Sequence, residues 1–308
     1  MKTKIFSILL LALASLSASA QQDPMITQYM SNQVFINPAY AGSHDYSTLS
    51  ALYRKQWVEF PGAPKTGFLT YDTRFKCSNI GMAFTFVNDR LGISERSDLS
   101  GIFTYHVRTS SKGQLSLGIK ASIGYYDAKL TELKVWDAND QTFANDVLNK
   151  WVPNVGLGAY YYTDKFYLGA ALPGLLRYRK PSEELASISL VPNFQRHYFV
   201  SSGYVFALPS DVYLKPSVLV KYTNDAPVEA DLNLNVFFMN RFSLGAGYRT
   251  KDGLVAMAEM YVTKNIRIGY AYDYPLTSIN NFSSGTHEVM VAYDFVRDLI
   301  KMKTPRFF

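Results

Sequence analysis

The feature that most constrains the fold of this chain is a pair of neighbouring segments, 229–238 and 242–249, in which polar and apolar residues alternate. Side chains on a β-strand point to opposite faces with a period of two residues. One face of this pair is apolar and carries Ala230, Leu232, Leu234, Val236, Phe242, Leu244, Ala246 and Tyr248. The other face is polar or small and carries Asp231, Asn233, Asn235, Ser243, Gly245, Gly247 and Arg249. A hairpin of this kind is typical of a membrane barrel with a wet lumen.

The same alternation recurs along the chain, most regularly in residues 115–125 and 266–274. The pattern predicts 14 strands, at 47–53, 67–75, 80–87, 97–107, 114–126, 154–162, 166–172, 197–207, 212–222, 229–238, 242–249, 254–262, 266–274 and 287–295. Many of them approach the roughly 9 to 11 residues that a tilted strand needs to cross a bilayer. We therefore expect an all-β fold, a transmembrane antiparallel β-barrel of about 14 strands.

The connections between these strands alternate between short and long, with two brief exceptions among the long ones. Outer-membrane barrels have short turns on the periplasmic side and longer loops outside. This rhythm favours a barrel over the alternative that composition leaves open, a large soluble β-sandwich. It predicts that both termini are periplasmic and that the long loops are extracellular.

The two ends of the chain differ from the strand region. Residues 1–20 have the lysines, apolar run and A-x-A site of a secretory signal peptide, and the run is too short for a spanning helix. We expect four parts: this signal, a periplasmic N-terminal segment at 21–46, the barrel at 47–295, and a basic periplasmic tail at 296–308. No apolar run of spanning length follows residue 20, so a helical membrane protein is excluded. The expected location is the outer membrane.

Composition supports this interpretation and removes several other classes. The 23 Tyr and 20 Phe suit aromatic girdles at the two membrane interfaces. A single cysteine, Cys77, rules out an internal disulfide framework. The net charge of +6 is dispersed rather than gathered into a basic stripe, so no nucleic-acid partner is expected.

The sequence lacks the patterns of an enzyme. Its 4 His do not stand at metal-ligand spacing, and nucleophile-elbow, phosphate-loop and dinucleotide patterns are missing. Ser97 or Ser100 with His106 is a pairing that arises easily by chance. The acidic residues of the longest loop, Asp127, Asp137, Asp140 and Asp146, suit a solvated loop better than a cation site. We expect no catalytic residue, no metal and no cofactor.

Charges of both signs fall on the inward face of the predicted strands. The candidate lumen charges are Asp231, Arg249, Glu259, Arg267 and Asp273. Such charges can pair across the lumen and fill it, or they can line a pore. The sequence leaves both arrangements open.

Four short motifs precede or begin the barrel: QDPMITQYM at 22–30, INPAYAGS at 36–43, YRKQW at 53–57 and GAPKT at 62–66. In combination they make the chain resemble the PorP/SprF family of type IX secretion system outer-membrane proteins. They cover about the first 55 mature residues. The rest of the chain agrees in length, signal peptide and barrel pattern, and the Val-Glu-Phe-Pro sequence at 58–61 is a minor departure.

The motif residues are the candidate contacts to a partner or a plug. They are Ile36, Asn37, Pro38, Tyr40, Arg54, Gln56, Trp57, Phe60, Gly62 and Pro64. Because 21–46 is rich in apolar side chains that require burial, we expect it to pack against or into the periplasmic mouth of the barrel rather than to be a flexible linker. Trp57 and Phe60 belong either to a partner-binding tip or to an inward plug, where Arg54 and Gln56 would meet lumen carboxylates.

The resemblance implies a non-enzymatic barrel embedded in outer-membrane lipid. One branch of the family is a core component that associates with a periplasmic, OmpA-like, peptidoglycan-binding partner. Another branch supports export or surface attachment of large cargo proteins, such as gliding adhesins, that carry a C-terminal sorting domain. The motifs do not choose between these branches. The alternative function is a solute-conducting porin or transporter.

Overall fold

The wall of the molecule is built from β-strands with alternating polar and apolar residues. The structure is a computed structural model, which describes residues 24–75, 78–132, 146–176, 196–224, 226–239 and 241–295. The strands are β1 (Thr48–Lys55), β2 (Lys65–Arg74), β3 (Ile80–Leu91), β4 (Ser94–Arg108), β5 (Gln114–Ala128), β6 (Val147–Tyr162), β7 (Phe166–Leu172), β8 (Tyr198–Tyr204), β9 (Phe206–Leu208), β10 (Val212–Thr223), β11 (Ala226–Phe238), β12 (Phe242–Arg249), β13 (Gly253–Tyr261), β14 (Ile266–Pro275) and β15 (Thr286–Asp294).

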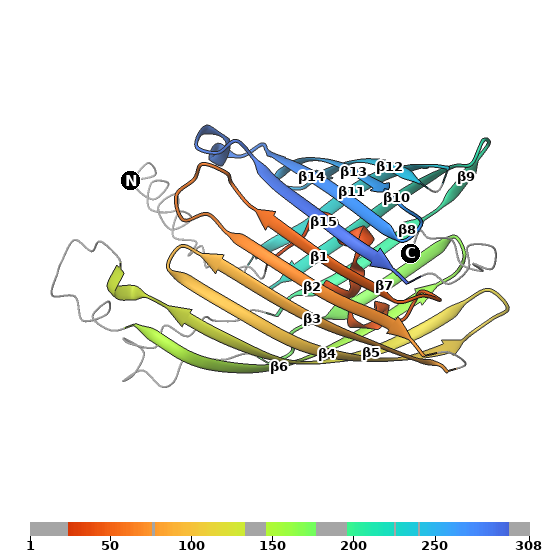
Figure 1. The fold of residues 1–308 in the computed structure, drawn as a ribbon, viewed down its shortest axis with the longest axis horizontal. Coiled ribbons are helices and arrows are strands. Elements are labelled where there is room, and N and C mark those ends of the chain that lie inside the picture. The colour runs from red at the N-terminus through yellow and green to blue at the C-terminus, as the bar shows by residue number, and fades with distance from the viewer. Residues whose placement is uncertain are drawn as a thin grey trace, which may run out of the picture.

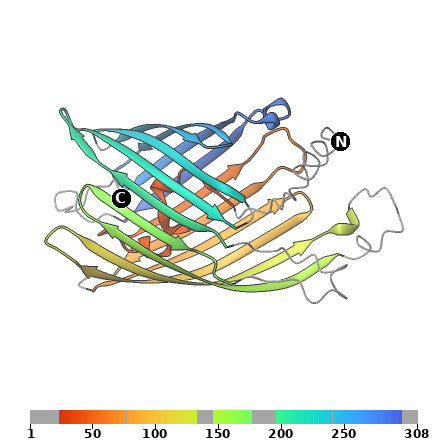
Figure 2. The ribbon, with the colours of Figure 1, turned by 180° about the vertical axis from the view of Figure 1, so that it is seen from behind.

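The strands form a closed antiparallel barrel (Figures 1 and 2). Each strand pairs with its neighbours in the chain, and β1 pairs with β15 from Thr48↔Asp294 to Lys55↔His287. Both β8 and β9 pair with β10, and they are one strand interrupted at Val205, so the wall has the expected 14 strand positions. The pairing of β1 with β15 joins the two ends of the sheet, whose unpaired backbone groups lipid could not satisfy.

The faces of the wall follow the period-two pattern of the sequence. In the hairpin of β11 and β12, Leu232 is 51% exposed on the outside, whereas its neighbour Asp231 is 3% exposed on the inside. The same exposed apolar face continues around the barrel through residues such as Leu117, Phe103 and Val289. An apolar outside and a polar inside match a wall that faces hydrocarbon.

The two ends of the barrel differ in their connections. The end that holds Thr48 and Asp294, here called the short-turn end, carries the turns at 75–80, 108–114, 162–166, 208–212, 238–242 and 261–266. The opposite end, here called the long-loop end, includes the loops at 55–65 and 275–286. The wall is taller than predicted at β5 and β6, because Ala128 pairs with Val147 in a stretch expected to be loop.

The segment before β1 lies inside the barrel. Residues 24–46, here called the plug segment, contain the short 3₁₀ helices η1 (Tyr29–Ser31), η2 (Gln33–Phe35) and η3 (Pro38–Tyr40). Figure 1 shows the plug segment as the red coil enclosed by the strands. We expected this segment to pack against or into the periplasmic mouth of the barrel, and its described residues lie within the lumen, from Thr27 beside Asp273 to Gly42 beside Asp72. Its apolar side chains form the core with inward residues such as Leu52, Phe68 and Leu219.

The predicted signal peptide at 1–20 and the basic tail at 296–308 lie outside the described residues. Within the described part of the chain, no helix has the length and apolar character required to cross a bilayer.

Candidate functional site

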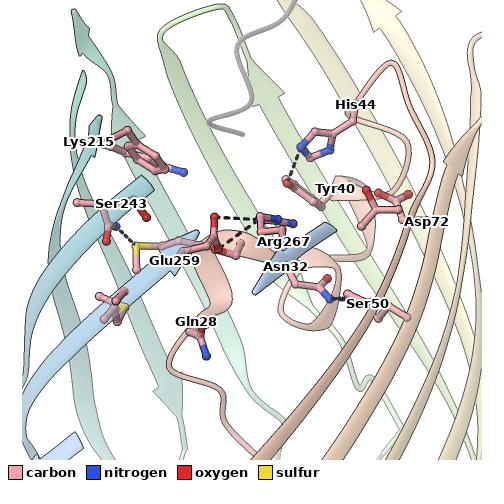
Figure 3. A pocket seen from close by; sticks show the side chains of 18 of the residues that line it. Gln28, Asn32, Tyr40, His44, Ser50, Asp72, Lys215, Ser243, Glu259 and Arg267 are labelled. Carbon is pink, nitrogen blue, oxygen red and sulfur yellow. Dashed lines mark hydrogen bonds and ion pairs between the residues drawn. The ribbon is translucent and has the colours of Figure 1, made fainter. Parts of the chain in front are cut away.

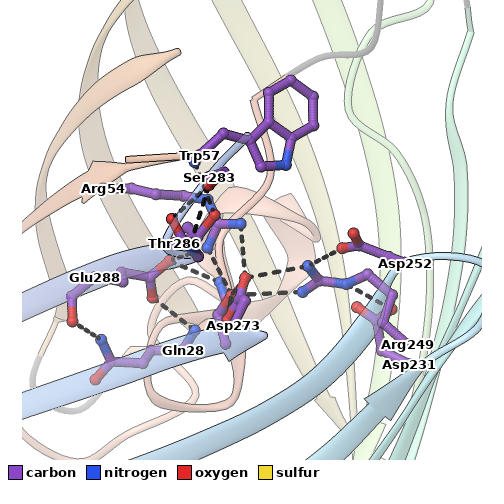
Figure 4. A network of polar contacts seen from close by, with 12 residues as sticks. Gln28, Arg54, Trp57, Asp231, Arg249, Asp252, Asp273, Ser283, Thr286 and Glu288 are labelled. Carbon is purple, nitrogen blue, oxygen red and sulfur yellow. Dashed lines mark hydrogen bonds and ion pairs between the residues drawn. The ribbon is translucent and has the colours of Figure 1, made fainter. Parts of the chain in front are cut away.

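A buried ion-pair network joins the first and last strands near the long-loop end (Figure 4). Arg54 of β1 lies opposite Glu288 of β15 in the strand register. Its Nη1 is 3.1 Å from Glu288 Oε2, and its Nη2 is 2.7 Å from Asp273 Oδ2 on β14. The three side chains are almost wholly buried, so these charge-assisted bonds are shielded from solvent. The network therefore holds the closing seam of the barrel from the inside.

The plug segment is bound into this network through the first of the sequence motifs. The backbone N–H groups of Thr27 and Gln28 donate to the two carboxylate oxygens of Glu288, both at 2.8 Å. The Thr27 hydroxyl donates to Asp273 at 2.8 Å and accepts from Arg54 Nη1 at 2.6 Å. The motifs around Thr27 and Arg54, separate in the sequence, thus meet at one pair of carboxylates.

A second arginine extends the network around the lumen. Arg249 lies 3.1 Å from Asp231, 3.0 Å from Asp252 and 3.4 Å from Asp273. Lys221 adds a bond of 2.8 Å to Asp231. Three of the five predicted lumen charges, Asp231, Arg249 and Asp273, therefore lie together, and they pair with one another instead of lining an open pore.

The other two predicted lumen charges form a separate cluster nearer the short-turn end. Arg267 Nη1 is 3.3 Å from Glu259, and Arg267 Nε is 3.9 Å from Asp294. The plug segment enters this cluster too, because the Ser31 hydroxyl donates to Glu259 at 2.6 Å. Both charge clusters are consequently bridged by the plug segment.

The second motif docks against glycines in the opposite wall. Asn37 Oδ1 accepts from the Ala39 N–H at 2.9 Å and caps η3, which begins at Pro38, and Asn37 Nδ2 donates to the Ala159 carbonyl at 3.0 Å. A Cβ added at Gly118 of β5 would lie 2.5 Å from the Ala39 nitrogen, and one at Gly158 of β6 would collide with Asn37. The wall therefore needs glycine where this turn approaches.

The end of the same motif fixes the plug segment near the short-turn end. Gly42 has a φ of +70° and donates its N–H to Asp72 at 2.7 Å. The Ala41 carbonyl accepts from the Thr104 hydroxyl at 2.8 Å and lies 3.1 Å from His106 Nε2. A side chain at Gly42 would be strained by the backbone and would meet Gly81 at 2.7 Å. Candidate residues Ile36, Asn37, Pro38 and Tyr40 are all buried.

A cavity remains between the plug segment and the wall near the short-turn end. Its volume is about 50 Å³, and Lys215, Asp72, Glu259 and Arg267 contribute to its polar lining (Figure 3). The Tyr40 hydroxyl and His44 Nε2, 3.3 Å apart, stand on its plug side. This volume suits a few water molecules and is far smaller than most ligand sites, which are roughly 300–1,000 Å³.

The first long loop stays outside the lumen. Gln56 donates its backbone N–H to the Pro64 carbonyl at 3.0 Å, and Val58 donates to the Gly285 carbonyl of the facing loop at 2.8 Å. Gly62 takes the left-handed conformation, with a φ of +76°, and Phe60 is 39% exposed. Of the candidate contacts in this part of the chain, Arg54 meets the lumen carboxylates, while Trp57, Phe60, Gly62 and Pro64 belong to the loop.

Two kinds of contact residue are missing from the predicted set. Thr27 and Gln28 belong to a recognised motif, but their partners are distant in sequence, so the motif alone did not reveal their role. Gly118 and Gly158 stand in strands where small inward residues are common, and only the fold shows what they face.

The residues considered for catalysis or metal binding are dispersed or otherwise engaged. Ser100 and His106 stand six residues apart on β4, roughly 20 Å along the strand. Asp146 accepts hydrogen bonds from the Thr131 backbone and hydroxyl, both at 2.9 Å, which lower the pKa of its carboxyl. Asp137 and Asp140 lie outside the described residues, among which no group of three His, Cys, Asp or Glu side chains is placed to hold a metal.

Comparison with known proteins gives a family match and several distant barrels. Residues 18–293 match the family described as type IX secretion system membrane protein PorP/SprF. No curated protein matches the chain. The solved structures to which it is similar include the Acinetobacter baumannii outer-membrane protein Omp33 (9% identity, TM-score 0.44, 82% of this chain and 99% of that chain). Another is a mutant of the monoaromatic hydrocarbon channel TodX (12% identity, TM-score 0.48, 86% and 94%). A third is the KdgM porin (10% identity, TM-score 0.38, 82% and 99%).

Proposed function

We propose that this chain, which belongs to the PorP/SprF family of type IX secretion system membrane proteins, acts as a plugged barrel with no enzymatic activity. It supports the secretion or surface attachment of cargo proteins, or it anchors the secretion machinery through a periplasmic partner. Membership of the family implies partnership with secretion components and location in the outer membrane. The particular cargo, with a C-terminal sorting domain, and the OmpA-like partner belong to the proposal.

The single observation that carries the proposal is the occupation of the lumen. The plug segment bonds to Glu288 at the long-loop end, to Glu259 in the other charge cluster and to Asp72 near the short-turn end. A solute-conducting porin needs a continuous wet path, whereas the charges here pair with one another and with the plug segment. A barrel without such a path acts through its surfaces, which are its two ends and its loops.

The long-loop end offers an ordered surface for a protein partner. Val58 and Gly285 join the loops at 55–65 and 275–286 through backbone bonds, and Gly92 donates to Gly62 at 2.9 Å to add the β3–β4 turn. Phe282 of this surface is 66% exposed. Exposed aromatic groups on an ordered backbone suit a protein contact, because little conformational entropy is lost when they bind.

Two measurements test the proposal together. The purified barrel, reconstituted in planar bilayers, is expected to show no steady ion conductance, while loss of the gene is expected to reduce type IX cargo at the cell surface. Affinity purification from mild detergent then identifies the partner. An OmpA-like protein indicates the machinery-anchoring role, and a large adhesin indicates the cargo role. Steady conductance together with an unchanged set of surface proteins would establish the porin alternative and overturn the proposal.

A further inference from the structure

The plug segment crosses the lumen in one direction, and its first described residues lie at the long-loop end. Met25 shares a small cavity with His197, Thr223 and Glu229. His197 immediately precedes β8, Thr223 ends β10, and Glu229 lies near the start of β11, so all three mark the long-loop end. The contacts of Thr27 with Arg54 and Asp273 lie in the same half of the barrel.

The later contacts follow in order toward the other end. The Tyr29 hydroxyl accepts from Asn233 Nδ2 at 2.9 Å midway along β11, and Asn32 Nδ2 donates to Ser50 at 2.7 Å. Gly42 then meets Asp72, two residues from the end of β2 at the short turn. From there the chain enters β1 at Thr48. The segment therefore runs from the long-loop end to the short-turn end before the wall begins.

From this course we infer that Pro24, the first described residue, faces the long-loop side of the outer membrane, whereas Asp294, the end of the last strand, faces the short-turn side. The two ends of the described chain then lie on opposite sides of the outer membrane. This differs from the expectation that both termini are periplasmic, which followed from the alternation of short and long connections. The number of strands fixes the barrel end at which β1 begins and β15 ends. The plug segment crosses the lumen before β1, so the chain crosses the membrane one additional time.

The physical basis is that the plug segment fits the closed lumen in one direction. The wall is closed, and apart from the cavity of about 50 Å³ the plug segment occupies the space between β1 and the glycines of β5 and β6. A reversed plug segment would leave the carboxylate of Glu288 without the Thr27 and Gln28 amides. For the plug segment to end inside a closed barrel, it must already lie among the strands before β1 pairs with β15 during folding.

Epitope accessibility tests the inference in the full-length protein within intact cells. One epitope is inserted between Gln22 and Asp23, after the predicted signal site. Two reference epitopes mark the barrel ends: one after Lys112 in a short turn, and one after Phe282 in a long loop. The amino-terminal epitope is expected to bind antibody in the same state of the cell, intact or permeabilised, as the Phe282 epitope. Labelling that instead follows the Lys112 epitope overturns the inference.

A second measurement covers the case in which an inserted epitope disturbs assembly. In a Cys77→Ser background, which removes the single native cysteine, Pro24→Cys, Lys112→Cys and Phe282→Cys are labelled separately with a membrane-impermeant maleimide. The Pro24→Cys protein is expected to be labelled under the same conditions as the Phe282→Cys protein and to differ from the Lys112→Cys protein. The readout compares positions rather than conductance, so a failure here is distinct from a failure of the proposed function.

Discussion

At the scale of single residues, Arg54 links the seam of the barrel to the plug segment. Its position on the inner face of β1 follows from strand parity, but its partners lie 219 and 234 residues further along the chain. Asp273 and Glu288 would repel one another without a cation between them. Arg54 and the amides of the plug segment supply the compensating donors, which explains why a buried cluster of this charge density is stable.

We expect Arg54→Ala to destabilise the folded barrel by about 3 kcal/mol, since removal of one partner leaves buried charges uncompensated. The measurement is the temperature at which the detergent-solubilised protein loses the fast electrophoretic mobility of a folded barrel. The matched control is Lys129→Ala. Lys129 also pairs with a carboxylate, Glu132 at 3.1 Å, but its side chain is 61% exposed, and no measurable shift is expected. Equal behaviour of the two variants would contradict the assigned role of Arg54.

At the scale of elements, the plug segment occupies the lumen of the barrel. It has only three short 3₁₀ helices, and it is held by side-chain and backbone contacts to the wall rather than by regular structure of its own. Its most exacting fit is at the Asn37–Ala39 turn, where glycines on β5 and β6 allow backbone to approach backbone. The fit depends on both the turn of the plug segment and the glycines of the wall, so neither sequence segment reveals it alone.

Deletion of residues 22–41 is expected to lower the yield and thermal stability of the barrel, because it removes the buried contacts of the plug segment. Barrel that does assemble is expected to conduct ions, since the paired charges then line a wet lumen. Single-channel recording and the electrophoretic assay measure the two effects. Unchanged folding, secretion and conductance would contradict the role of the plug segment.

A milder variant serves if the deletion prevents assembly. Gly118→Val keeps every residue of the plug segment but places a side chain 2.5 Å from the Ala39 nitrogen. We expect displacement of the turn, at a cost of roughly 1–3 kcal/mol typical of overpacking, and the appearance of conductance. Gly101→Ala on β4 is the control, because its added Cβ would meet nothing closer than 4.0 Å.

At the scale of the whole molecule, the outward apolar face determines where the protein resides. Leu234 lies near the middle of β11 and is 45% exposed, and its cross-strand neighbours Pro216 and Ala246 continue the apolar surface. In water this face would promote aggregation, whereas in hydrocarbon it is the favourable solvent contact. The same apolar face that defines the outside of the barrel therefore also accounts for its location in the membrane.

Leu234→Lys is expected to cost about 2–4 kcal/mol, the penalty for a cation near the bilayer midplane. The measurement is equilibrium unfolding in lipid vesicles by urea. Leu234→Met, which keeps an apolar side chain of similar volume, is expected to behave like the unchanged protein. Equal stability of the Lys and Met variants would mean that this face does not contact lipid.

The sequence by itself determined the wall of this protein. Strand parity is a local property, because the position of a side chain along its own strand decides whether it points inward or outward. The alternation therefore predicted the 14 strand positions and the lipid face. It also predicted the inward direction of Asp231, Arg249, Glu259, Arg267 and Asp273. Only the tertiary structure decided what those charges meet. Arg54 with Glu288, Ser31 with Glu259 and Asn37 with Gly158 are contacts between segments far apart in the chain, fixed by barrel closure and by the course of the plug segment. For the same reason, the sequence predicted that the plug segment packs against or into the barrel mouth, but not its course through the lumen. Apolar content shows that a segment must be buried, whereas the shape of the closed wall decides where.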